Sequence, residues 1–112
     1  MRTIYIDADA CLVKNETYKV ALRKGWSALV VANQYIQTPR SNLIAAITVG
    51  RGEDVADDWI AERCEPGDVV VSNDIPLAAR CLDKGARVIR QKGHEMSTDS
   101  IGEALAGREL SQ

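Results

Sequence analysis

The feature that most constrains this chain is the alternation of short apolar runs with stretches of helical periodicity. The apolar runs, rich in Val, Ile and Ala, lie at residues 3–8, 27–33, 44–49, 68–73 and 86–90, and the helical stretches between them at 14–24, 53–64 and 74–85. Strands separated by helices in this way form βαβ units, which build a parallel sheet with helices on both faces. The pattern therefore predicts an α/β fold with about five mostly parallel strands.

The remaining segments complete this expected fold. Residues 34–43 contain Pro39 and are predicted to be a loop, as are residues 91–98, and residues 99–110 are predicted to form a last helix. The first helix is expected to stop at Gly25 and to bury one face, made of Val13, Thr17, Val20 and Ala21. A length of 112 residues suits one domain, residues 1–112.

Composition excludes several classes of protein. The formal net charge of −2 gives no overall basic field for binding nucleic acid nonspecifically. The three cysteines, Cys11, Cys64 and Cys81, are an odd number without a CxxC motif, which fits buried thiols in a reducing cytosol. No apolar run approaches the ~18 residues of a membrane span, and the N-terminus lacks the apolar region of a signal peptide. We therefore expect a cytoplasmic protein without a membrane span.

Aspartates gather where the predicted strands end and the predicted helices begin. Asp7 and Asp9 follow the first strand, Asp74 follows the fourth, and the helix at 53–64 opens with Asp54, Asp57 and Asp58. Residues i and i+2 of an extended chain point to the same side, so the first pair is expected to face one spot. Ligands of parallel sheets bind at the carboxyl ends of strands. We therefore expect these carboxylates to converge there.

Converging carboxylates repel one another unless a cation or protons compensate. Oxygen ligands suit hard cations, and Mg²⁺ or Mn²⁺ held by a few carboxylates is common beside phosphate substrates. Such ions activate water and stabilise charge during phosphoryl displacement. The sequence thus favours a metal-dependent phosphodiesterase site.

Helix capping is the alternative explanation for most of these aspartates. Asp74, with Pro76 two residues later, is a good N-cap, and Asp54 with Asp57 resembles a capping box. Capping explains the pair Asp7 and Asp9 less easily, because a carboxylate at the end of a central strand is costly without a partner.

Three long motifs resemble one family of bacterial proteins. The stretches DADACLVK, GRGEDVADDWI and GDVVVSNDIPLAARCLDKGA together look like the YaiI/YqxD family, which is grouped with PIN-like domains, and the resemblance spans nearly the whole chain. It implies a PIN-like three-layer sandwich whose acidic cluster holds divalent metal in ribonucleases. Asp7, Asp57 and Asp74 resemble the three principal aspartates of such nucleases, and Asp9 and Asp54 match further acidic positions of the narrower family.

The chain departs from the family pattern in a few places. Leu12 stands where the family commonly has proline, and Asn73 stands where a small residue is usual before the aspartate. Many relatives continue past the last helix into a polar, Gly-containing tail. If that tail contributes to substrate contact, a chain without it is expected to be weakened.

Polar residues near the acidic positions are candidates for substrate contact. Lys14 begins the first helix, Asn33 ends the second strand, and Asn73 precedes Asp74. Arg87 and Lys92 belong to a basic stretch that offers phosphate contacts, with a solvated surface as the alternative. The single histidine, His94, is not expected to be catalytic.

The leading hypothesis is a PIN-like, Mg²⁺- or Mn²⁺-dependent nuclease that hydrolyses RNA or another phosphodiester. Asp7, Asp57 and Asp74 are its expected catalytic residues and primary metal ligands. Asp9, Asp54 and Asp58 are expected to be secondary acids of the same metal site that orient waters. A noncatalytic binding or interaction protein is the first alternative. A phosphatase-like hydrolase with an aspartate nucleophile is the second, because a DxD after a first strand also serves that chemistry.

Overall fold

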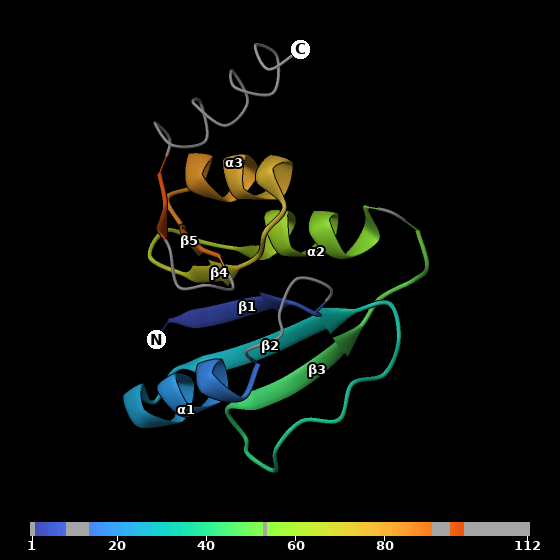
Figure 1. The fold of residues 1–112 in the computed structure, drawn as a ribbon, viewed down its shortest axis with the longest axis vertical. Helices are drawn as coiled ribbons and strands as arrows, with labels where there is room; N and C mark the ends of the chain where they lie inside the picture. Colours follow the sequence, from blue (N-terminus) through green and yellow to red (C-terminus); the bar gives the residue numbers. More distant parts are fainter. Residues whose placement is uncertain (1, 9–13, 53, 91–94, 98–112) are drawn as a thin grey trace.

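The computed structural model describes residues 2–8, 14–52, 54–90 and 95–97, which form an α/β fold (Figure 1). One sheet contains six strands in the order β3–β2–β1–β4–β5–β6. The elements are β1 Thr3–Asp7, α1 Lys14–Lys24, β2 Ser27–Ala32, β3 Ile44–Thr48, α2 Val55–Arg63, β4 Val69–Val71, α3 Ile75–Asp83, β5 Arg87–Ile89 and β6 Glu95–Met96. Strands β1 to β5 pair in parallel, and only β6 is antiparallel. The predicted fold class is confirmed.

The sheet has a separate apolar core on each face. Successive strand residues point to opposite faces, so Tyr5 packs with α2 and α3, whereas Ile4 and Ile6 pack with α1. Figure 1 shows α2 and α3 above the sheet and α1 below it. The result is a three-layer arrangement with a largely aliphatic interior, as the scarcity of aromatic residues predicts.

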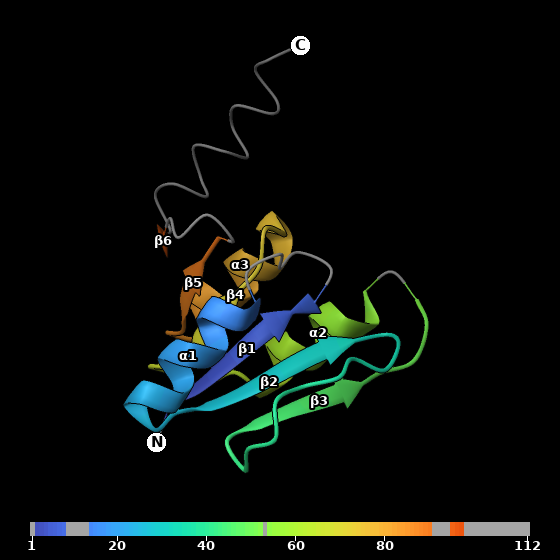
Figure 2. The same ribbon diagram turned by 60° about the horizontal axis from the view of Figure 1, so that its bottom comes forward.

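The order of the strands reverses beside β1. The chain moves from β1 to β2 and then β3, and it returns across the sheet to place β4 on the other side of β1. Figure 2 shows the arrowheads of β1, β2 and β3 reaching the same edge of the sheet. We call this the carboxyl edge. Ligands of open α/β sheets bind where such a reversal leaves a crevice between neighbouring strand ends, here β1 and β4.

Helix α1 has the predicted bounds, and its buried face agrees with the prediction only in part. It ends at Gly25, whose φ of 72° is a left-handed conformation that favours glycine. Ala21 is fully buried, as predicted. Thr17 and Val20 are only half-buried, and the other buried residue is Tyr18, which was not predicted. The large apolar ring of Tyr18 gains more from burial than the small, polar Thr17. Val13 lies outside the described residues.

The other predicted elements are longer than the observed ones, and one prediction of a loop is wrong. Asp54 and Asp74 are the N-caps of α2 and α3, so α2 begins at Val55, two residues later than predicted, and α3 at Ile75, one residue later. Within the predicted loop 91–98, the two residues of β6 pair with β5. The Arg87 side chain joins the two strands there through hydrogen bonds of 3.1 Å and 2.6 Å to Glu95. The predicted last helix lies outside the described residues.

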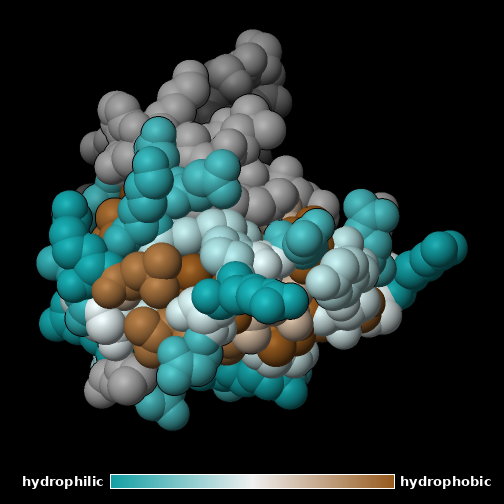
Figure 3. All heavy atoms as spheres, turned by 90° about the horizontal axis from the view of Figure 1, so that it is seen from below, coloured by the Kyte–Doolittle hydropathy of each residue, from teal (hydrophilic) through white to brown (hydrophobic). Residues whose placement is uncertain are grey.

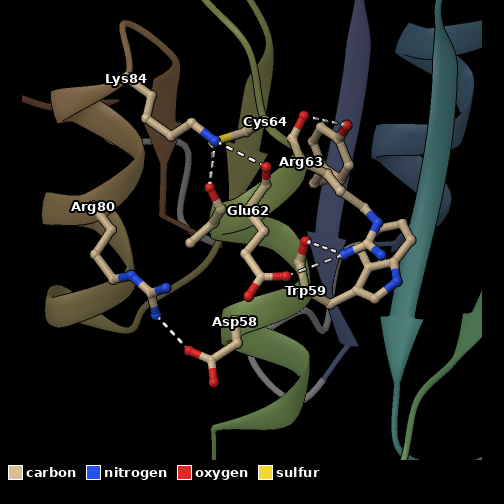
Figure 4. A network of polar contacts seen from close by, with 9 residues as sticks. Asp58, Trp59, Glu62, Arg63, Cys64, Arg80 and Lys84 are labelled. Carbon is tan, nitrogen blue, oxygen red and sulfur yellow. Dashed lines mark hydrogen bonds and ion pairs between the residues drawn. The ribbon is translucent and has the colours of Figure 1, made fainter.

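Two cations, Arg80 of α3 and Lys84 at its C-cap, reach across to α2 (Figure 4). The Lys84 ammonium donates to the backbone carbonyl oxygens of Ala61 at 2.7 Å and Glu62 at 3.0 Å. Carbonyls in the last turn of a helix lack intrahelical partners, so this lysine satisfies two of them. Arg80 pairs with Asp58 at 2.6 Å near the other end of α2. These contacts help to fix α2 beside α3.

The surface and the thiols agree with a packed domain. Viewed from below, where β3 is the edge strand, apolar residues form a band between hydrophilic side chains (Figure 3).

Cys64 and Cys81 are free and fully buried, and burial together with the neighbouring Cys64 thiol raises the pKa of Cys81 to about 12. These two cysteines therefore act as small core residues, as predicted. Among the described helices, none has the length and apolar character needed to cross a membrane.

Candidate functional site

Asp7, the last residue of β1, is a buried carboxylate at the reversal of strand order. Its exposed fraction is 7%, and its Oδ2 accepts a hydrogen bond of 3.1 Å from the hydroxyl of Ser72, which follows β4 and is fully buried. A carboxylate at this depth is costly unless hydrogen bonds or charges compensate. The Ser72 hydroxyl provides part of that compensation and joins the ends of β1 and β4.

Ser72 also connects Asp7 to the start of α3. Its oxygen accepts a hydrogen bond of 3.0 Å from the backbone N–H of Asp74. Asp74 in turn accepts a bond of 2.8 Å from the backbone N–H of Leu77, so the predicted capping role is confirmed. Sequence reasoning missed Ser72, because a serine after three valines looks like the end of a strand. Its position two residues before Asp74 was the available signal.

Asp57, in the first turn of α2, lies close enough to feel both of these carboxylates. Its pKa is raised from 3.8 to about 6, first by burial and then by the negative charges of Asp74 and Asp7. The amino end of a helix ordinarily favours a carboxylate, so repulsion and burial outweigh that effect here. The structure therefore brings three of the predicted aspartates, from three separate elements, into one electrostatic environment.

The donor chemistry at this acidic centre, Asp7, Asp57 and Asp74, fits a hard cation, but the coordination is incomplete. Carboxylate oxygens are the ligands that Mg²⁺ and Mn²⁺ prefer, and the repulsion felt by Asp57 is what a cation would relieve. Within the part of the chain that the structure describes, no three His, Cys, Asp or Glu residues are arranged to hold a metal ion. Asp9, another predicted ligand, lies outside that part. Mg²⁺ usually retains several waters, so it needs few direct protein ligands.

The two other predicted acids of α2 have different surroundings. Asp54 is exposed and makes no side-chain capping bond, so the predicted capping box with Asp57 is wrong. Asp54 contributes instead, as the smallest cause, to the raised pKa of Asp57. Asp58 is exposed and accepts a hydrogen bond of 2.6 Å from Arg80. Neither residue is as closely tied to the centre as Asp57.

The predicted substrate contacts divide between the two edges of the sheet. Asn33 and Asn73 are exposed and follow β2 and β4 at the carboxyl edge, where α1 also begins at Lys14. The side chain of Lys14 is not among those described. Arg87 is level with Val69 at the amino end of β4 and is paired with Glu95, so it lies away from the acidic centre. Lys92, His94 and Leu12 lie outside the described residues.

These features define an α/β protein whose acidic centre lies at the carboxyl ends of two adjacent parallel strands. A family model described as "Uncharacterized BCR, YaiI/YqxD family" matches residues 5–112. The chain belongs to this family, so the resemblance found in its motifs is confirmed.

Similar proteins extend over nearly all of the chain. A UPF0178 protein of Caulobacter vibrioides is 54% identical over 110 residues, which are 98% of this chain and 72% of the relative. A UPF0178 protein of Bradyrhizobium diazoefficiens is 55% identical over 107 residues, which are 96% of this chain and 64% of the relative. One from Gluconacetobacter diazotrophicus is 54% identical over 110 residues, covering 98% and 71%. No solved structure matches the chain.

Proposed function

We propose that this protein is a Mg²⁺- or Mn²⁺-dependent nuclease of the PIN-like type that hydrolyses phosphodiester bonds of RNA. The observation that carries the proposal is the electrostatic coupling of Asp57 to Asp74 and Asp7, which raises the pKa of Asp57 to about 6. Repulsion of this kind, at a reversal of strand order, is characteristic of a site that gains stability from a bound cation. The motifs shared with PIN-like domains support the same function.

The described residues have separate roles in this proposal. A bound divalent ion would supply a polarised water and neutralise charge on the phosphate. Asp7 is held in place by the Ser72 hydroxyl, and Asp74 by the backbone N–H of Leu77. A bound cation would relieve the repulsion from Asp74 and Asp7 that raises the pKa of Asp57, and so would favour its carboxylate form. The secondary acids are Asp9, Asp54 and Asp58, and the substrate contacts are Lys14, Asn33 and Asn73.

Cleavage of single-stranded RNA in Mn²⁺ tests this proposal, with Asp7→Asn as the diagnostic variant. The chain offers a matched control in Asp68, which has the same exposed fraction of 7% but lies at the opposite edge of the sheet. Asp68 accepts hydrogen bonds from the backbone N–H groups of Thr3 and Glu65, which is a structural role. We expect Asp7→Asn to lose about 100-fold or more in rate, and folded Asp68→Asn to retain its rate. Equal cleavage rates for Asp7→Asn and the parent would contradict the proposed mechanism, in which Asp7 helps to hold the metal ion.

Thermal shift measurements test the cation separately from catalysis. Mg²⁺ or Mn²⁺ is expected to raise the melting temperature of the parent, because a ligand that binds only the folded state stabilises it. Asp74→Asn is expected to reduce this rise while keeping the helix cap, since Asn caps helices about as well as Asp. A parent that shows no metal-dependent shift would count against metal binding.

A noncatalytic binding protein of the same fold is the second candidate. Asp74 caps α3, Asp58 pairs with Arg80, and the described residues contain no three-ligand metal group. If these acids serve only as caps and surface charges, Asp7→Asn would leave function intact and preserve or raise stability. No metal would raise the melting temperature. The two measurements above therefore separate the candidates.

A further inference from the structure

The carboxyl edge also carries exposed side chains that the acidic centre does not use. Arg51 follows β3, Tyr35 follows β2, and Arg90 follows β5. The strand order β3–β2–β1–β4–β5 therefore places a cation and an aromatic ring on one side of Asp7 and a cation on the other. The strands that these residues follow end side by side along the carboxyl edge.

The register of the sheet places Arg90 level with the acidic centre. Ile6 pairs with Val71, and Val71 pairs with Ile89. The residues that follow these three are Asp7, Ser72 and Arg90. The backbone N–H of Ser72 donates to the carbonyl of Ile89 at 3.1 Å, so the register continues to this point. Arg90 is exposed and forms no ion pair with any other described residue.

Arg51 follows β3, which lies on the other side of β1 from β5. Strand β3 keeps its pairing with β2 to the edge, where the backbone N–H of Val49 donates to Ala32 at 2.8 Å. Arg51 comes two residues later, in the segment that Figure 1 shows leading from the tip of β3 to the start of α2. It too is exposed, with no ion pair inside the described ranges.

Tyr35 is the aromatic residue that packing does not explain. Its exposed fraction is 75%, whereas the other four aromatic residues, Tyr5, Tyr18, Trp26 and Trp59, are buried or half-buried. It lies three residues after the end of β2, the strand between β3 and β1. An exposed ring offers a face on which an unpaired base can stack.

We propose that the carboxyl edge binds an extended single-stranded RNA chain, with phosphates on Arg51 and Arg90 and a base on Tyr35. The inference rests on the proposed function in that it places the phosphate to be cleaved at the acidic centre. Adjacent strands are about 4.8 Å apart, so β3 and β5 are about 20 Å apart. A mononucleotide is too short to reach both arginines, whereas a chain of several nucleotides spans them. Unpaired bases, unlike those of a duplex, are free to stack on a protein ring.

Binding measured without cleavage tests the proposed RNA binding along the carboxyl edge. Fluorescence anisotropy of labelled oligouridylates, from dimer to dodecamer, is recorded in EDTA and in Ca²⁺ over a range of salt concentrations. Affinity is expected to rise with length until the chain spans both arginines. Arg51→Gln and Arg90→Gln are each expected to reduce the slope of log K against log salt by about 0.7, the value for one phosphate of a single strand. Tyr35→Ala is expected to weaken binding about tenfold, and Tyr35→Phe to bind normally.

Two arginines away from this edge serve as controls. Arg23 is in the last turn of α1, and Arg40 precedes β3, so both lie toward the amino ends of the strands. Arg23→Gln and Arg40→Gln are expected to leave the slope unchanged. Three outcomes would overturn the proposed RNA binding at the carboxyl edge. They are equal losses in these controls, a mononucleotide that binds as tightly as the dodecamer, and no binding at all. Length-dependent binding without Mn²⁺-dependent cleavage would instead overturn only the proposed hydrolysis.

Discussion

The hydroxyl of Ser72 donates a hydrogen bond of 3.1 Å to Asp7 Oδ2, although 65 positions separate the two residues in the sequence. This bond joins β1 to β4 at the reversal of strand order. Because the same hydroxyl accepts from the backbone N–H of Asp74, one buried side chain orients two of the three central aspartates. Ser72 thus links β1, β4 and the start of α3 at the acidic centre.

Ser72→Ala is expected to lower the free energy of unfolding by about 1–3 kcal/mol. The substitution leaves a buried carboxylate and a backbone N–H with one partner fewer, and unsatisfied buried groups cost that much. Urea denaturation measures the loss. In a double-mutant cycle with Asp7→Ala, we expect a coupling of at least about 0.5 kcal/mol. Strictly additive effects would show that the hydrogen bond contributes nothing to stability.

Asp57→Asn is expected to stabilise the protein at pH 7. The pKa of Asp57 rises from 3.8 in the unfolded chain to about 6 in the folded one, so the folded state binds more protons between these values. The stabilisation that protonated Asp57 gives is therefore complete below pH 3.8 and is lost as the pH rises to about 6. Removing the charge is worth about 1 kcal/mol at pH 7, after discounting for solvent screening at this partly exposed group.

Denaturation as a function of pH provides the check on Asp57. The parent is expected to lose stability relative to Asp57→Asn between pH 4 and pH 6, with little further change above that range. Glu62→Gln is the control, because Glu62 lies on the same helix but is exposed and only loosely paired with Arg63 at 3.7 Å. If both variants follow the parent curve, Asp57 does not feel the other two carboxylates.

The positions of the principal aspartates could be predicted because they depend on patterns among residues that are close together in the sequence. An apolar run followed by Asp marks a strand end, which located Asp7 and Asp74, and a helical period preceded by acids located Asp57. The parallel sheet then requires strand ends to share an edge. Nothing local states that β4 lies beside β1, so the sequence did not reveal that Ser72 faces Asp7.

Other features depended on interactions between distant segments or on very short elements. Strand β6 has two residues, too few to show any period. It pairs with the edge of β5, where the Arg87 side chain forms an ion pair with Glu95. The buried face of α1 was misjudged because counting apolar residues ignored the size of the Tyr18 ring. The absence of a capping bond at Asp54 likewise follows from its backbone angles, φ −111° and ψ 8°, which composition does not specify.

Asp74→Ala is expected to destabilise the protein by about 1 kcal/mol, whereas Asp74→Asn is expected to cost little. The side chain of Asp74 caps α3 through its bond of 2.8 Å to the N–H of Leu77, and Asn can accept the same bond. Thermal denaturation without metal compares the two variants. A large loss in Asp74→Asn would mean that the negative charge itself, and not the cap, stabilises the metal-free protein.

Lys84→Met is expected to cost about 1 kcal/mol, more than Arg80→Met, although both residues link α3 to α2 (Figure 4). The ammonium of Lys84 satisfies two terminal carbonyls of α2 at 2.7 Å and 3.0 Å, and charged hydrogen bonds of this kind are among the stronger ones. Arg80 and Asp58 form an ion pair whose side chains are 47% and 53% exposed, and exposed pairs contribute little. Urea denaturation of the two variants measures the difference.

Because Lys84 helps to hold α2 in place, its loss is also expected to lower the pKa of Asp57 toward 3.8, which the pH dependence of stability would reveal. An unchanged pH profile in a destabilised Lys84→Met would show that the acidic centre is positioned by the sheet and not by this contact between the helices.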